Sequence, residues 1–213
     1  MLPAPRKPRL RGRIHQVAFF VSLPAGLSLV ALAQTPTSRI VTAIYAASLT
    51  LLYGASALLH RMDWAPRLLA RMRKLDYSAI FLLIAGTNTA LAFLALEGAW
   101  RVVLLSVVWA GAVAGIALKT FRVDGFQITA PVLYLALGWV GIVAAPVYFP
   151  LLGVLKASLL VTGGVLYTVG LVVLTRRRPD PVPHVYGYYE VWHTMVVAAS
   201  LCHYLLVLLL ILG

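Results

Sequence analysis

Long apolar runs separated by short polar segments fill almost the whole chain. A helix that crosses a bilayer needs ~20 mostly apolar residues, because each residue rises about 1.5 Å and the hydrocarbon core is about 30 Å thick. The pattern therefore predicts an all-α polytopic membrane protein, a seven-transmembrane helix bundle. The expected spans cover residues 16–33, 40–59, 77–96, 102–118, 126–147, 151–174 and 187–212. Pro146 and Pro150 are expected to bracket a tight turn between the fifth and sixth spans.

Composition agrees with this pattern and excludes a soluble domain. The 213 residues are 62% hydrophobic and only 11% charged, and only lipid can cover that much apolar surface in a chain of this size. The net charge of +12 could suggest a nucleic-acid-binding protein. The basic residues lie in short segments between apolar runs, which is the pattern of membrane topology and argues against nucleic acid as a partner.

The basic residues also predict an orientation. Fifteen of the 18 Lys and Arg residues fall on one side of the expected spans, and Arg39, Arg101 and Lys156 fall on the other. The fifteen lie in the N-terminal tail, the second-to-third loop, the fourth-to-fifth loop (Lys119 and Arg122) and the sixth-to-seventh loop. The positive-inside rule then places the N-terminus in the cytoplasm and the C-terminus outside a cell membrane. Residues 1–15 form a basic cytoplasmic tail, and residues 16–213 form the seven-span domain.

A cleaved signal peptide is the alternative interpretation of the first span. The basic tail, the apolar run and the small residues Ala31 and Ala33 imitate such a signal. The run is long for the apolar part of a signal peptide, and cleavage would leave six spans without inverting the others.

Candidate chemistry gathers at the predicted cytoplasmic end of three spans. With the orientation set by charge, five polar side chains reach a similar depth in the inner leaflet: Ser56, His60, Asp76, Glu190 and His193. Ionisable groups at such depths are costly and usually functional. Imidazole and carboxylate groups suit zinc, and a carboxylate beside a zinc-bound water can act as a general base.

Structural roles are the competing interpretation of these residues. Asp76 can pair with Arg73 or Lys74, His60 can simply end a helix at the interface, and Glu190 can pair with an Arg on the cytoplasmic side. The other histidines are expected to stay outside the site. His15 and His184 are expected to be solvated in the tail and a loop, and His203 to make an interhelical hydrogen bond ~15 Å from His193.

At these residues the chain resembles the hemolysin III branch of the PAQR family, which includes the adiponectin and progestin membrane receptors. The resemblance rests on SALLH at residues 56–60, KLDYSAIFLLIAGT at 74–87, LYLALGW at 133–139, and YEVWH at 189–193 followed by VVAASLCH at 196–203. It implies a seven-helix bundle with the N-terminus inside and a zinc ion in the cytoplasmic half. It further implies His60 and His193 as zinc ligands and Asp76 as the holder of the zinc-bound water.

Tyr189 is where the chain departs from the family pattern. It occupies the position of the first histidine in the His-xxx-His motif that the family has on the seventh helix. Neutral tyrosine is a poor zinc ligand, since its pKa is ordinarily about 10. Three hypotheses follow: Asp76 or Glu190 becomes the third ligand, the metal binds weakly, or the site is empty and Tyr189 hydrogen-bonds to His60 or Asp76.

The resemblance implies three functions of different classes. The first is zinc-dependent hydrolysis of a lipid amide such as a ceramide, with Asp76 as the base and Ser56 orienting the oxyanion or the water. The second is a non-enzymatic membrane-homeostasis or lipid-sensing protein with a degenerate metal site. The third, a pore-forming cytolysin, is the weakest, because no span has the polar stripe of a water-filled pore.

Overall fold

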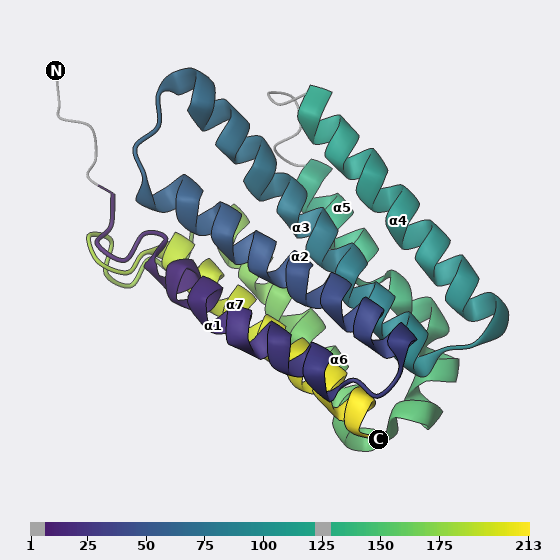
Figure 1. Ribbon diagram of the computed structural model, residues 1–213. Helices are drawn as coiled ribbons and strands as arrows, with labels where there is room; N and C mark the ends of the chain where they lie inside the picture. The colour runs from purple at the N-terminus through teal and green to yellow at the C-terminus, as the bar shows by residue number, and fades with distance from the viewer. Residues whose placement is uncertain (1–6, 122–128) are drawn as a thin grey trace, which may run out of the picture.

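The computed structural model describes residues 7–121 and 129–213, and these are almost entirely helical (Figure 1). Within these ranges no β-strand forms, and Val182 and Tyr186 make only an isolated bridge. Arg6, Arg122 and Phe126, which the sequence places in the tail, a loop and the start of the fifth span, lie outside the described residues. The elements are α1 (Arg13–Leu32), α2 (Pro36–Arg61), α3 (Pro66–Ala95), α4 (Gly98–Phe121), α5 (Thr129–Gly138), the 3₁₀ helix η1 (Val140–Ala144), α6 (Ala145–Arg176) and α7 (Tyr188–Leu212).

Six helical stretches of the described chain are long and apolar enough to cross a membrane, which confirms a polytopic helical membrane protein. Five of them are α1, α2, α3, α4 and α7, each within a few residues of its predicted position except α3. That helix begins at Pro66, eleven residues before the expected start, because the basic segment continues the same helix. The sixth stretch runs from Pro131 to Arg176 and contains α5, η1 and α6.

The structure differs from the sequence prediction between the fifth and sixth spans. The expected helix over residues 126–147 ends at Gly138, and a 3₁₀ helix leads into α6. Pro146 lies in the first turn of α6, where a missing N–H costs no helical hydrogen bond. The kink lies at Gly153, whose φ of 66° suits glycine, and not between Pro146 and Pro150.

The helix ends fall at two ends of the bundle. Figure 1 shows the start of α1, the end of α2 and the start of α7 near one another, and we call this the basic end. The segment before α1 lies beside the connection between α6 and α7 there (Figure 1), and the amide of Leu10 donates to the carbonyl of Val185 at 3.1 Å. Residues 7–12 are thus attached to the bundle and cover its basic end.

The central helices of the bundle are α2 and α3, and more than half of the most apolar part of each is buried. Polar side chains inside the bundle tie neighbouring helices together. The indole nitrogen of Trp109 on α4 donates to the hydroxyl of Thr89 on α3 at 3.0 Å, and the Tyr134 hydroxyl on α5 donates to the carbonyl of Tyr77 at 3.1 Å. This core positions the side chains of α2, α3 and α7 at the basic end.

Candidate histidine site at the basic end

The structure brings together several of the residues that the sequence singled out. The ring centres of His60 on α2 and His193 on α7 lie 5.1 Å apart. Tyr189, one turn before His193, lies 5.0 Å from the His60 ring and 5.2 Å from the His193 ring. The three rings therefore form one cluster between two helices that are distant in sequence.

Asp76 and Ser56 form a second pair at the same end. Asp76 on α3 is only 7% exposed, Ser56 on α2 is 3% exposed, and the two side chains share a hydrogen bond. In the described part of the chain neither Arg73 nor Lys74 pairs with Asp76. The Lys74 amine instead donates to the Thr120 carbonyl at 2.6 Å. The buried carboxylate is therefore held by a hydroxyl and not by a neighbouring cation.

Glu190 pairs with an arginine, as the structural interpretation of this residue expects. The Arg11 Nε donates to Oε1 of Glu190 at 2.6 Å, and the Gly187 amide donates to Oε2 at 2.9 Å. Glu190 is fully buried, and both of its oxygens are engaged. Arg11 also lies over the Tyr189 ring at 4.7 Å. These contacts favour a structural role for Glu190, at the point where the N-terminal segment meets α7.

His15 belongs to the cluster, and the expectation that it is solvated is wrong. It lies in the first turn of α1, is 3% exposed, and stacks on His193 with ring centres 3.9 Å apart and an angle of 18° between planes. The reason is that α1 begins at Arg13, before the expected start of the first span. A signal was present in the sequence: the buried stripe of α1, which includes Ala18 and Ser22, continues at helical spacing back to His15.

Several imidazole nitrogens in this cluster have no protein partner. Both nitrogens of His15, Nε2 of His60 and Nδ1 of His193 are buried without a hydrogen bond of good geometry. Leaving such an atom unpaired costs about 1–3 kcal/mol, and neutral imidazole nitrogens are donors that zinc uses. As the rings stand, no group of three or more His, Cys, Asp or Glu side chains within residues 7–121 and 129–213 is arranged to hold a metal ion. The donor chemistry suits a metal, but the stacked rings would have to separate.

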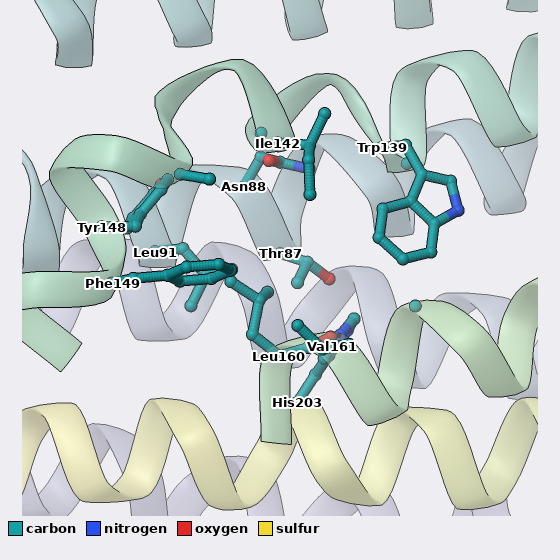
Figure 2. Close-up of a pocket in the computed structure, with 14 residues that line it drawn as sticks. Thr87, Asn88, Leu91, Trp139, Ile142, Tyr148, Phe149, Leu160, Val161 and His203 are labelled. Carbon is teal, nitrogen blue, oxygen red and sulfur yellow. Dashed lines mark hydrogen bonds between the residues drawn. The ribbon is translucent and has the colours of Figure 1, made fainter. Parts of the chain in front are cut away.

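The other two histidines lie apart from the cluster. His184 is exposed in the connection before α7, as expected. His203 lines a separate cavity of about 60 Å³, bordered by Thr87 and Asn88 of α3 and by Trp139 and Tyr148 (Figure 2). Its Nε2 lies 3.4 Å from the Leu160 carbonyl on α6, which agrees with the expected interhelical bond. His203 therefore packs α6 against α7 and does not join the histidine cluster.

Comparison of the sequence with known proteins finds relatives over nearly the whole chain. The family model described as "Haemolysin-III related" matches residues 4–204. Hemolysin-3 of Bacillus cereus is 34% identical over 202 residues, which cover 93% of this chain and 89% of that protein. The Hemolysin-3 homolog of Bacillus subtilis (strain 168) is 33% identical over 198 residues, covering 91% and 89%. The chain therefore belongs to the haemolysin-III related family.

Proposed function

We propose that this protein is a zinc-dependent hydrolase of lipid amides, with its site at the basic end of a helix bundle in the cell membrane. One observation carries the proposal: His193, Ser56 and Asp76 are buried and His60 is half-buried at the same end of the bundle, and these residues come from three helices. Buried imidazole nitrogens without hydrogen-bond partners, at the same end of the bundle as a buried carboxylate, are a costly arrangement for a purely structural site.

Each residue then has a defined role. His60 and His193 would hold the zinc ion through their unpartnered nitrogens. Zinc, when bound, polarises a carbonyl and makes hydroxide available near neutral pH. Asp76 accepts the proton of the attacking water and returns it to the leaving nitrogen as the amide C–N bond breaks, so that a carboxylic acid and an amine leave. Ser56 holds Asp76 in position and can orient the water.

A groove on the lipid-facing side of the bundle supports a lipid substrate. It is open and almost wholly apolar, has a volume of about 680 Å³, and runs between α1 and α2. Leu58 and Leu75 line it, and they lie two residues before His60 and one residue before Asp76 in the sequence. Ligand pockets commonly have volumes of 300–1,000 Å³. An acyl chain lying in this groove would place its amide near the site from within the membrane.

Seven crossings with the N-terminus in the cytoplasm are part of the proposal. The stretch from Pro131 to Arg176 is 46 residues long, about 70 Å of helix at 1.5 Å per residue, which is twice the bilayer core. The kink at Gly153 lets this stretch cross once in each direction. The positive-inside rule then puts the basic end, with the site, in the cytoplasmic half.

Amide hydrolysis by purified protein tests the proposal. The protein loaded with zinc in detergent should release fatty acid from a ceramide, and Asp76→Asn should reduce the rate at least 100-fold, within the ~10²–10⁴ range for loss of a positioned base. Asp63→Asn is the matched control, since Asp63 pairs only with Lys7 at an exposed position and should keep full activity. Equal rates for the wild type and Asp76→Asn would contradict the assignment.

Non-enzymatic lipid sensing is the second candidate, and Tyr189 favours it. A tyrosine at a position where the family has a histidine, in edge contact with the His60 and His193 rings, is what a site that has lost a metal ligand would contain. A sensor would bind lipid without releasing fatty acid, and its cellular function would survive Asp76→Asn. Comparison of the wild type with Asp76→Asn in a cell-based membrane assay therefore separates the two functions.

A further inference from the structure

The cavity that His203 borders lies apart from the histidine cluster and takes no part in the function proposed above. It has a volume of about 60 Å³ and lies between α3, the stretch that contains α5, η1 and α6, and α7 (Figure 2). His203 follows His193 by ten residues on α7, so the cavity is ~15 Å further from the basic end. It is therefore a second, separate candidate binding site.

A break in the helical backbone forms one wall of this cavity. Helix α5 ends at Gly138, and the 3₁₀ helix η1 follows before α6 begins at Ala145. Trp139, Gly141 and Ile142 from this break line the cavity together with Gly138. Irregular backbone within a spanning stretch is tolerated where it is buried in protein or lines a cavity, and discontinuous helices frame ligand sites in membrane transporters. The break thus favours a binding role for the cavity.

The inner part of the cavity carries polar groups that the protein leaves unused. Thr87, Asn88 and Tyr148 line it and are each more than nine-tenths buried. Asn88 donates from Nδ2 to the Ile84 carbonyl at 2.9 Å, but its Oδ1 and the Thr87 hydroxyl make no hydrogen bond with any described residue. The Tyr148 hydroxyl is also buried without a partner. Because buried polar groups are ordinarily paired, these three indicate a ligand with a hydrogen-bonding group.

The outer part of the cavity faces lipid. Ile142, Phe149 and Val161 line it and are also exposed at the surface of the bundle. They belong to the apolar stretch from Pro131 to Arg176, whose exposed side chains contact hydrocarbon in a membrane. A ligand that enters here comes from the bilayer, so most of it must be apolar.

Size and charge restrict the polar end of the ligand. No Asp, Glu, Lys or Arg is among the described residues that line the cavity, so an ionic head group would be buried at membrane depth without a counter-charge. The cavity of about 60 Å³ has the volume of roughly two water molecules. It has room for a hydroxyl group and the carbon that carries it, and a sugar or phosphate head group is too large.

We propose that this cavity binds a neutral lipid whose polar end is a single hydroxyl group, such as a long-chain alcohol. The hydroxyl donates to Oδ1 of Asn88 and accepts from the hydroxyl of Thr87 or Tyr148. The chain leaves the cavity past Ile142 and Phe149 into the bilayer. This site requires neither zinc nor amide hydrolysis.

Photo-crosslinking to purified protein in detergent tests the proposal. The probe is hexadecanol with a diazirine group in its chain, and mass spectrometry of peptides locates the label. We expect label within residues 139–149 or 160–164 and competition by unlabelled hexadecanol. Hexadecane lacks the hydroxyl and hexadecanoate carries a charge, so each should compete at least about 10-fold less well. Equal competition by hexadecane would overturn the assignment of the hydroxyl.

Two variants change the cavity with little disturbance of the helices. A Cβ at Gly141 would meet only Oδ1 of Asn88, at the ordinary contact distance of 3.6 Å. The methyl group of Gly141→Ala would take the space of the ligand hydroxyl and should weaken binding about 10-fold, as overpacking does. Thr87→Val keeps the shape but removes one hydrogen bond, which should weaken binding about 5-fold. Ser158→Ala is the matched control, because Ser158 is exposed and its hydroxyl donates to the Leu155 carbonyl of its own helix.

The outcomes separate this site from the proposed hydrolase. Wild-type labelling in Gly141→Ala, or label confined to residues outside the cavity, would overturn the proposal. If Gly141→Ala does not fold, the competition between hexadecanol and hexadecane in the wild type decides. Loss of labelling in Gly141→Ala but not in Ser158→Ala supports the site, whether or not the protein hydrolyses a ceramide.

Discussion

At the scale of single residues, the pair of Arg11 and Glu190 is the contact on which the basic end depends most. Glu190 is fully buried, so Arg11→Ala would leave an uncompensated charge or force a proton onto it. We expect a loss of about 3 kcal/mol of unfolding free energy, the cost of breaking a buried pair. Thermal unfolding in detergent would measure it. Lys7→Ala, which removes an exposed pair with Asp63, should leave the melting temperature unchanged.

The sequence predicted the positions of those site residues that a local pattern locates, and it missed those that depend on contacts between distant segments. Ser56 and His60 share a helix face four residues apart, and the charge pattern put Asp76 at the same depth, where the structure joins it to Ser56. The arginine that pairs with Glu190 could be predicted only as a class, because Arg11 lies 179 positions away. His15 was missed because a polar residue beside a basic tail resembles a solvated one.

At the scale of elements, the junction between the N-terminal segment and α1 determines whether the histidine cluster is complete. Gly12, just before α1, has a φ of 76°, and a Cβ there would lie 2.8 Å from the Cβ of His60. Gly12→Ala should destabilise the protein by roughly 1–2 kcal/mol from its left-handed backbone alone and further from the contact with His60. Because this contact aligns α1, the substitution should also weaken zinc binding.

A matched glycine isolates the effect of the contact. Gly98 also has a positive φ, 57°, but a Cβ there would meet nothing within 4 Å. Gly98→Ala should therefore carry the backbone cost without any change in zinc affinity. Zinc affinity can be measured by titration with a chelator. Equal loss of zinc binding in both variants would show that the contact between Gly12 and His60 does not shape the site.

Element boundaries were predictable where apolar runs end in charged or turn-forming residues, and less so elsewhere. The predicted and observed ends of α7 agree within one residue, since Gly187 precedes the helix and Glu190 caps it. Between Gly138 and Gly153 the chain stays apolar throughout, so hydropathy gave no signal for the end of α5 or for η1. Proline was misleading there because Pro146 starts a helix.

At the scale of the whole molecule, an odd number of crossings requires the two termini to lie on opposite sides of the membrane. In a Cys202→Ser background, Gly213→Cys should react with an impermeant thiol reagent in intact cells. His184→Cys, in the exposed connection before α7, should react only after permeabilisation. The reverse pattern, with His184→Cys labelled in intact cells and Gly213→Cys only after permeabilisation, would favour six crossings, with the stretch from Pro131 to Arg176 crossing once.

The central proposal is that His60 and His193 hold a zinc ion at the basic end of the bundle. Anomalous diffraction from crystals of the zinc-loaded protein, collected on both sides of the zinc absorption edge, tests it most directly. The account predicts one strong peak per chain, within bonding distance of His60 and His193. A map without a peak among these rings, or a peak at exposed residues only, would contradict it.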